Sequence, residues 1–291
     1  MSYQLVLVLL LTSFISLSTF AGECPALFPG SDSRAEWRLS NRQPSRAVAV
    51  VVHGLNINPG KMRTIENALL ADRIDVLHVS LSGHNNNINI FRRVSAKMWE
   101  RDTLRAYCLA SQRADKYNMP IYYVGFSLGG VMGVAIANKY ENVHFDKMAL
   151  FAPALSIRRA NFLTRLLNSL NPLALIPNVM NRDYYASALG TPVSAYKATL
   201  DVSAYLAHHT NRNRVNTSTL LFYDKRDELI SPTGTFAYMR EHRLTNWKTY
   251  QVQKRPFSRA SMFHHIMIDP ASVGQKKWAD MKSALLKHFD E

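Results

Sequence analysis

The sequence predicts an α/β fold with a mainly parallel sheet flanked by helices. Strand-like and helix-like segments alternate along most of the chain, which is the pattern of successive β-α units. Residues 47–52 form an uninterrupted apolar run, as expected for a parallel strand that is buried on both faces. The chain has 291 residues, of which 47% are hydrophobic and 19% are charged, and this composition indicates a globular protein with a sizeable core rather than a disordered one.

The elements follow in order from apolar runs and from the residues that end them. Strands are expected at residues 47–52, 76–81, 121–126, 147–151, 217–223 and 247–253. Helices are expected at residues 59–70, 95–117, 128–140, 233–243 and 273–288. The longest of these helices is amphipathic and ends at Asn118 and Pro120, and the strand at 147–151 ends before Pro153.

The segment of residues 154–213 interrupts this alternation. It contains no clear strand, but it does contain apolar, helix-like pieces such as residues 162–167. A structureless stretch of this length is unusual inside a compact domain, so we expect an inserted helical cap or lid. Such a cap either covers an apolar substrate or is simply part of the buried packing. The expected organisation is a signal peptide at 1–21, core segments at 22–153 and 214–291, and the cap between them.

The N-terminal region predicts export. Residues 5–20 are apolar apart from Thr and Ser, and no charged side chain precedes Glu23. This run is shorter than the ~20 residues that a membrane-spanning helix needs. We therefore favour a secretory signal peptide, cleaved after Ala21, over an uncleaved anchor, and expect a secreted or periplasmic protein. In that oxidising compartment Cys24 and Cys108 either form a disulfide or remain two unrelated thiols.

The formal net charge is +14, but the basic residues are scattered pairs that match no nucleic-acid-binding motif. We expect a solvated cationic surface, with attraction to anionic membranes or acidic substrates as the alternative. No nucleic-acid partner is expected. The sequence leaves the oligomeric state open.

The most informative motif is Gly125-Phe126-Ser127-Leu128-Gly129, which stands between an expected strand and an expected helix. A sharp strand-to-helix turn holds its central residue in a strained conformation and needs small neighbours, as Gly125 and Gly129 are. The turn exposes the Ser127 hydroxyl beside a helix N-terminus, which favours developing negative charge. This pattern predicts a nucleophilic serine.

A serine nucleophile needs a histidine base, which in turn needs an orienting carboxylate. The turn after the strand at 217–223 offers Asp227 as the preferred acid, with Asp224 and Glu228 as competitors. The loop between the last strand and the last helix offers His264 and His265, which follow in the order Ser, Asp, His.

The oxyanion of a tetrahedral intermediate needs two backbone N–H donors. One is expected from Leu128, directly after the nucleophile, and the other from Leu55, in the loop after the strand at 47–52. In that loop Gly54 permits a tight turn, and we expect His53 to brace the loop rather than to act as a base.

Together the motifs His53-Gly54, Gly125-Phe126-Ser127-Leu128-Gly129, Asp227 to Pro232 and His264-His265 resemble those of the α/β-hydrolase superfamily. The resemblance is nearest to bacterial carboxylesterases and to monoacylglycerol-lipase-like or lysophospholipase-like members, and it covers residues from about 46 to the C-terminus except the cap. It implies the α/β-hydrolase fold. It also favours His264 over His265 as the base, because His264 stands five positions before Asp269. Trp99 and Asp102 are similar to residues on the helix before the nucleophile, whereas Asp224 stands where the family usually has Gly.

The expected function is that of an exported serine hydrolase that cleaves carboxylic esters through an acyl-enzyme. Ser127, His264 and Asp227 would form the triad, the amides of Leu55 and Leu128 would bind the oxyanion, and no metal or other cofactor is implied. An ester with an acyl chain is expected because the cap is apolar and the surface cationic. The alternatives are amide, thioester or perhydrolase chemistry on the same fold, and a non-catalytic protein that binds lipids or polyanions.

Overall fold

The computed structural model describes residues 24–158, 171–178, 182–254 and 263–291. The signal-peptide prediction and the piece at 162–167 therefore lie outside the described residues. A disulfide joins Cys24 to Cys108, with their Cα atoms 5.6 Å apart, so the start of the described chain is tied to a helix of the core. Within the described ranges, no helix is both long enough and apolar enough to span a bilayer.

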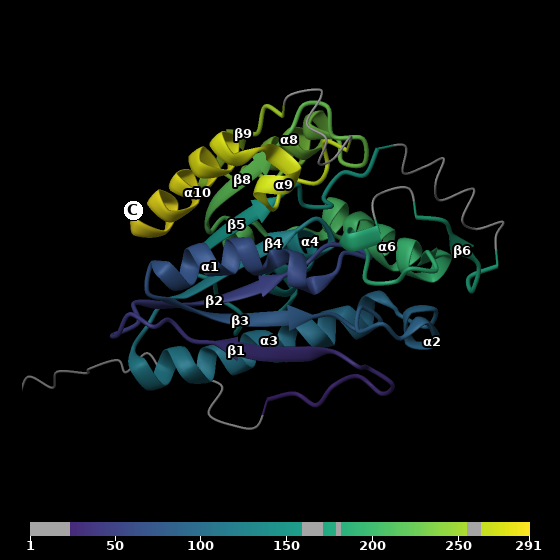
Figure 1. Ribbon diagram of the computed structural model, residues 1–291, viewed down its shortest axis with the longest axis horizontal. Helices are drawn as coiled ribbons and strands as arrows, with labels where there is room; N and C mark the ends of the chain where they lie inside the picture. Colours follow the sequence, from purple (N-terminus) through teal and green to yellow (C-terminus); the bar gives the residue numbers. More distant parts are fainter. Residues whose placement is uncertain (1–23, 159–170, 179–181, 255–262) are drawn as a thin grey trace, which may run out of the picture.

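A seven-stranded sheet with the order β1-β3-β2-β4-β5-β8-β9 forms the centre of the molecule, stacked from β1 at the bottom to β9 at the top of Figure 1. Its strands are β1 (Arg34–Arg38), β2 (Ala47–Val52), β3 (Ile74–Ser80), β4 (Ile121–Phe126), β5 (Lys147–Phe151), β8 (Ser218–Tyr223) and β9 (Trp247–Gln251). All neighbours pair in parallel except β1, which runs antiparallel to β3. The predicted mainly parallel sheet is confirmed.

The edge strand β1 was not predicted, because its sequence carries no apolar run. Arg34, Glu36 and Trp37 are exposed on it. It is a strand because it pairs with β3, and nothing in its own composition indicates this pairing. Polar edge strands of this kind protect a sheet from pairing with other chains.

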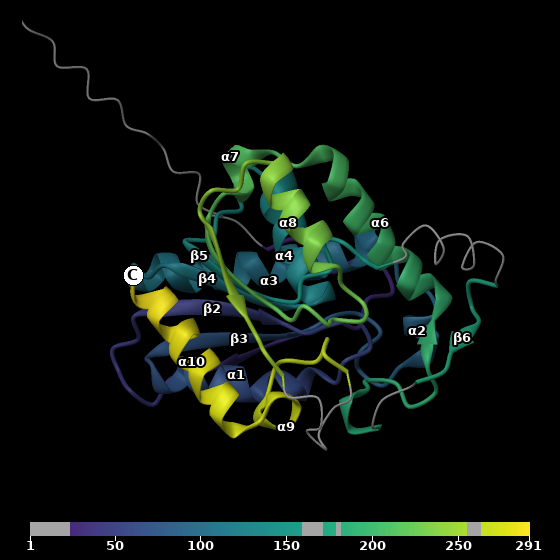
Figure 2. The same cartoon turned by 90° about the horizontal axis from the view of Figure 1, so that it is seen from above.

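Helices cover both faces of the sheet. They are α1 (Arg63–Ala71), α2 (Ile88–Phe91), α3 (Ala96–Tyr117), α4 (Leu128–Lys139), α6 (Val193–His209), α7 (Arg212–Val215), α8 (Pro232–Glu241), α9 (Pro270–Val273) and α10 (Gln275–Asp290), with 3-10 turns η1 (Pro59–Met62) and η2 (Arg182–Tyr184). Figure 2 shows α1 and α10 on one side of the sheet and α4 and α8 on the other.

The alternation of side chains along a strand explains the two layers. In β2, Val48 and Val50 belong to the apolar cluster under α3 and α4, whereas Ala49 and Val51 belong to the cluster under α1 and α10. All six residues of β2 are inaccessible to solvent. The continuous apolar run is therefore a strand buried on both faces, as predicted.

Local signals set most helix ends near the predicted positions. The Ser95 side chain caps α3 by accepting a hydrogen bond from the Met98 amide, and Asn118 ends the helix in the left-handed conformation. The helix predicted at 273–288 is found as α10, which begins two residues later, because Gly274, with φ of 86°, separates it from the short helix α9.

The insertion between β5 and β8 is only partly helical in its described residues. It contains a small antiparallel pair, β6 (Leu175–Ile176) with β7 (Thr191–Pro192), which was not predicted. The long helix α6 follows and packs against α3 and α4. In Figure 1, β6 and α6 lie on the side toward which the arrows of β2 and β3 point, which is the carboxyl end of these strands.

Candidate active site

Ser127 occupies a sharp turn between β4 and α4. Its φ of 50° and ψ of −109° are strained for a residue with a side chain. Hydrogen bonds hold this backbone on both sides: its N–H donates to Phe151 O at 2.9 Å, and its carbonyl accepts from the Ala154 amide at 3.0 Å. The strain is thus maintained by the neighbouring strand β5 and the residues that follow it.

The two glycines of the motif are required by close backbone contacts. A Cβ atom on Gly125 would lie 2.6 Å from Gly130 N, and one on Gly129 would lie 2.3 Å from Val52 O. These distances are far shorter than a van der Waals contact, so the turn can form only with glycine at both positions.

The structure brings Ser127, His265 and Asp227 together in one hydrogen-bonded line. The Ser127 hydroxyl lies 2.9 Å from His265 Nε2, and His265 Nδ1 lies 2.8 Å from Asp227 Oδ2. All three residues are buried. This is the geometry in which a histidine can take the serine proton while a carboxylate orients the ring.

Asp227 is held ionised in this line. Burial by itself raises the pKa of its carboxyl, but the charge and hydrogen bond of His265 and the amides of Leu229 and Ile230 outweigh it and lower the pKa below its ordinary value. Both amides donate to Asp227 Oδ1 at 2.8 Å, which leaves Oδ2 for the imidazole. Asp227, the acid preferred from the sequence, is thus the carboxylate in contact with His265.

The preference for His264 as the base is corrected by this geometry. His264 Nδ1 instead lies 3.4 Å from Asp224 Oδ2. The five-residue spacing to Asp269 misled, because Asp269 caps α9 through the amide of Ser272 and accepts a hydrogen bond from the Tyr184 hydroxyl. Neighbouring residues in a turn point in different directions, and no local signal indicates which of them faces inward.

The two competing acids have backbone partners instead. Asp224 accepts hydrogen bonds from the amides of Arg226 at 2.8 Å and Lys254 at 3.2 Å. Glu228 accepts from the amides of His264 at 3.0 Å and His265 at 3.2 Å. These carboxylates shape the turns that carry the acid and the base.

The loop that contains Leu55 lies against the start of α4, because the Gly129 amide donates to His53 O at 3.0 Å. Leu55 and Leu128, the two expected oxyanion donors, therefore lie on neighbouring segments. Within the described part of the chain, neither amide donates a hydrogen bond to a backbone carbonyl.

Two buried histidines hold this loop. His53 Nε2 accepts from the Leu81 amide at 3.0 Å while its Nδ1 donates to Gly54 O at 2.8 Å. His84 Nε2 accepts from the Asn56 amide at 2.9 Å. Burial lowers the pKa of His53 well below its ordinary value and lowers that of His84 to about 4. Both rings are therefore neutral near pH 7, which is the state in which each can accept an amide proton.

A cavity of about 170 Å³ opens beside the serine. Its lining is mainly apolar, and the described residues that line it include no Asp, Glu, Lys or Arg. The lining residues come from the loop after β2 that contains Leu55 (named the oxyanion loop for its expected role), the turn at Ser127, the insertion, the turn after β8 and the loop before α9. They are Leu55, Asn56, Ile57, Phe126, Ser127, Ala154, Ile157, Tyr185, Thr191, Tyr196, Thr199, Leu200, Leu229, Ile230, Phe263, His265 and Ile266.

The model of the family described as serine aminopeptidase, S33, matches residues 43–271, which is most of the chain. The protein belongs to this family of α/β hydrolases. No curated protein matches it by sequence.

Solved structures with the same fold include lipases and esterases. A soluble variant of monoglyceride lipase from Saccharomyces cerevisiae, in complex with a substrate analogue, has a TM-score of 0.71 at 13% identity and covers 93% of this chain and 97% of its own. A metagenome-derived lipolytic enzyme has a TM-score of 0.67 at 18% identity, with 91% and 100% covered. A thermostable carboxyl esterase from Bacillus coagulans, in complex with glycerol, has a TM-score of 0.65 at 11% identity, with 89% and 94% covered.

Asn56 is a residue next to the candidate site whose role the sequence did not indicate. Asn56, with φ of 50°, is buried beside Leu55. Its side chain donates to Thr191 Oγ1 at 2.8 Å and to Asn178 Oδ1 at 3.0 Å, and accepts from the Ser187 amide at 2.8 Å. Asn56 thereby ties the oxyanion loop to the insertion, and an asparagine in a loop gives no local signal of such a role.

A second missed connection runs from α3 to the loop after β3. Asp102 accepts hydrogen bonds from the amide and hydroxyl of Ser82 at 2.9 and 2.6 Å, and Trp99 Nε1 donates to Ser82 O at 3.0 Å. The same loop carries His84. The resemblance had pointed to Trp99 and Asp102 without indicating what they contact.

In the described ranges, no three His, Cys, Asp or Glu side chains are arranged to hold a metal ion.

Proposed function

We propose that this protein is an exported serine hydrolase that cleaves carboxylic esters through an acyl-enzyme. The observation that carries the proposal is the hydrogen-bonded line from Ser127 through His265 to Asp227, which borders an apolar cavity. Membership of a family of α/β hydrolases and the fold shared with esterases and lipases support it.

The reaction proceeds in two proton-balanced halves. Ser127 Oγ attacks the ester carbonyl carbon as His265 Nε2 accepts the hydroxyl proton, and the amides of Leu55 and Leu128 donate to the oxyanion. The intermediate collapses, the alkoxy group leaves, and it takes the proton from His265 to depart as an alcohol. Water then attacks the acyl-enzyme with His265 as base, which releases the carboxylic acid and restores Ser127.

The cavity favours an uncharged, apolar acyl group. An aminopeptidase must bind the α-ammonium of its substrate, and a carboxylate in the site is the usual partner for such a charge because a buried cation without one is costly. Among the described residues that line the cavity there is no such carboxylate. We therefore assign ester cleavage rather than removal of N-terminal amino acids to this member of the family.

The insertion and the surface suit a lipid-like ester. Thr191, Tyr196 and Leu200 line the cavity from the insertion, which supports its role as a lid in addition to its packing against the core. Leu229 also lines the cavity and is 52% exposed, so apolar surface continues from the site to the outside. A net charge of +14 favours approach to an anionic membrane.

Export, with cleavage after Ala21, is part of the proposal. The disulfide between Cys24 and Cys108 supports it, because such bonds persist in oxidising compartments. N-terminal sequencing of the protein recovered from the medium or periplasm tests this point. A protein retained in the cytoplasm with its first residues intact would contradict it.

The decisive experiment combines fluorophosphonate labelling with hydrolysis of p-nitrophenyl esters of increasing acyl length. Wild type, Ser127→Ala and His265→Ala are compared, and leucine p-nitroanilide is included as an aminopeptidase substrate. We expect wild type to label and to cleave esters in preference to the anilide, and Ser127→Ala to do neither.

Two outcomes would overturn the proposal. A preference for the anilide would make the protein a peptidase. A folded wild type that neither labels nor cleaves any ester, but binds anionic vesicles as tightly as Ser127→Ala does, would instead indicate a non-catalytic lipid-binding protein.

A further inference from the structure

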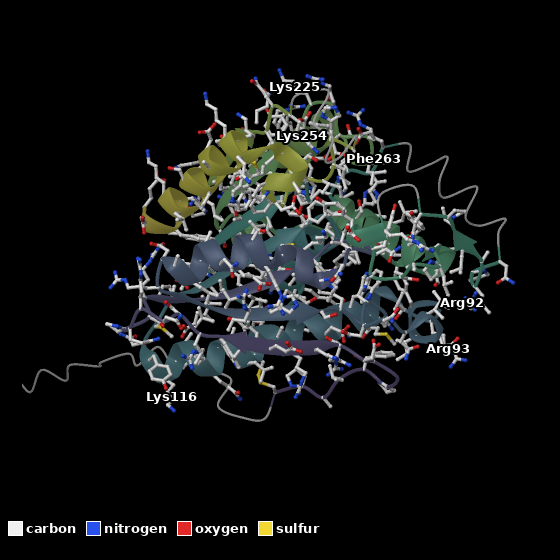
Figure 3. All side chains as sticks on the ribbon, viewed as in Figure 1. Arg92, Arg93, Lys116, Lys225, Lys254 and Phe263 are labelled. Atoms are coloured by element: carbon white, nitrogen blue, oxygen red, sulfur yellow. A yellow bond between two sulfur atoms is a disulfide. The ribbon has the colours of Figure 1, made fainter. Side chains whose placement is uncertain are left out.

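Lys254 is a buried cation that the proposed mechanism does not use. It follows β9 and is only 3% exposed. In Figure 3 it lies further inside the molecule than Lys225, which projects from the outer turn. Long cationic side chains normally reach solvent, so a lysine held inside needs strong partners.

The partners of Lys254 are the carbonyls on either side of the histidine pair. Its ammonium donates to Phe263 O at 2.6 Å and to Ile266 O at 2.7 Å. His264 and His265 stand between these two residues in the chain. The ammonium therefore clamps both ends of the short turn that carries the proposed base.

Glu228 binds the same turn through its other backbone groups. Its carboxylate accepts hydrogen bonds from the amides of His264 at 3.0 Å and His265 at 3.2 Å. Four consecutive residues thus have two carbonyls bound by a cation and two amides bound by an anion. Glu228 follows directly after Asp227, so the clamp also links the turn of the proposed base to the turn of the proposed acid.

The backbone of Lys254 adds a third link. Its amide donates to Asp224 Oδ2 at 3.2 Å, in the turn that carries Asp227. Burial lowers the pKa of the ammonium to about 8, against the opposing effect of the carboxylates of Asp224, Glu228, Asp269 and Asp227. The ammonium keeps most of its charge at neutral pH because acidic groups surround it.

We propose that Lys254 and Glu228 are positioning residues that hold the turn 263–266 so that His265 Nε2 stays in line with the Ser127 hydroxyl. The inference rests on the proposed serine hydrolase function and adds two residues outside the triad to its machinery. Neither side chain touches the reacting atoms, so both act through the backbone of His265. A displacement of the base by about 1 Å can lower the rate about 100-fold.

The test measures the rate per active site in Lys254→Met and Glu228→Gln. Lys254→Met removes the donors and keeps a side chain of similar length, whereas Glu228→Gln leaves one acceptor oxygen for two amides. Matched controls are Lys225→Met in the neighbouring turn and Glu241→Gln at the end of α8, both on exposed residues. Fluorophosphonate titration at completion counts the folded active sites, and its rate reports the reactivity of Ser127.

We expect Lys254→Met to lower kcat and the labelling rate by about 10- to 100-fold, and Glu228→Gln by about 3- to 10-fold, with KM nearly unchanged. The labelled fraction at completion and the two controls should match wild type. A merely structural role would reduce the labelled fraction and leave the rate per labelled site unchanged, and that result would overturn the inference.

A chemical rescue separates the ammonium from the bulk of the side chain. The two cysteines of the chain are joined to each other, so Lys254→Cys carries a single free thiol. Its thiolate displaces bromide from 2-bromoethylamine, which forms a thioether that ends in an ammonium at nearly the lysine length. The reaction is run in denaturant without reductant, followed by refolding, and wild type is treated identically.

We expect the aminoethylated variant to recover most of the labelling rate that Lys254→Cys loses. Equal rates before and after alkylation would contradict a role for the ammonium. If Lys254→Met fails to fold, Glu228→Gln still decides, because its side chain is exposed. If wild type itself neither labels nor turns over esters, the proposed function fails, whereas an active wild type with equally fast variants removes this inference alone.

Discussion

His84, in the loop after β3, accepts a hydrogen bond from the backbone amide of Asn56 at 2.9 Å. This buried imidazole therefore holds the residue that follows Leu55 in the oxyanion loop. The ring can do this only while it is neutral. Burial keeps it neutral by lowering its pKa to about 4. The integrity of the oxyanion loop is therefore linked to pH through His84.

The first prediction concerns the acid sensitivity of this link. The unfolded state of His84 titrates near 6.5 and the folded state near 4, so between these values the unfolded state binds more protons. The contribution of His84 to the free energy of unfolding is then present above pH 6.5 and is lost as the pH falls toward 4. Urea unfolding of wild type and His84→Phe should show a difference that shrinks over this window. A difference independent of pH would contradict the assignment.

The second prediction separates the two adjacent histidines. His265→Ala should lower kcat/KM for ester hydrolysis by about 10⁴-fold, because it removes the base, whereas His264→Ala should stay within about tenfold of wild type. Ester hydrolysis, corrected for the folded fraction by circular dichroism, measures both. The reverse ranking would restore His264 as the base.

The third prediction tests the packing of the nucleophile turn. Gly129→Ala would place a Cβ atom 2.3 Å from Val52 O and 2.6 Å from His53 O, so we expect a loss of stability of about 3 kcal/mol or more and loss of labelling. Gly60→Ala is the control, because its Cβ would meet only Asn58 Oδ1 at 3.2 Å, and it should change stability by less than about 1 kcal/mol. Thermal unfolding of the two variants distinguishes them, and equal effects would contradict the model of the turn.

The fourth prediction concerns Asp102, whose pH dependence has the opposite sign to that of His84. Burial raises the pKa of its carboxyl to about 6, against the hydrogen bonds from Ser82 and Ser31. Between 3.8 and about 6 the folded state binds more protons than the unfolded state, so this group's contribution to stability falls as the pH rises through that range. The free energy of unfolding of wild type relative to Asp102→Asn should decrease by at most about 3 kcal/mol from pH 4 to pH 6.5. No change, or an increase, over this range would contradict a raised pKa of the Asp102 carboxyl.

Much of the fold follows from short-range patterns. The strands at 47–52 and 147–151 have the predicted bounds. A short, uninterrupted apolar run is typical of a parallel strand that is covered by helices on both faces. The nucleophile turn was equally visible, since its two glycines are needed by steric contacts within or next to the motif. The polar strand β1 and the pair of β6 and β7 were not predicted, because they are strands through pairing with distant segments and not through their composition.

The sequence by itself determined the α/β class and the sharp turn at Ser127, because local sterics and hydrophobic periodicity act over a few residues. It also predicted the residue types of the proposed triad. The tertiary structure decided that His265 and not His264 faces Ser127, that Cys24 pairs with Cys108, and that Lys254 and Glu228 bind the histidine turn. Ser127 and His265 are 138 positions apart, and Asp227 and His265 are 38 apart. Which side chains meet over such separations depends on how whole helices and strands pack, and a pattern of a few residues does not predict that packing.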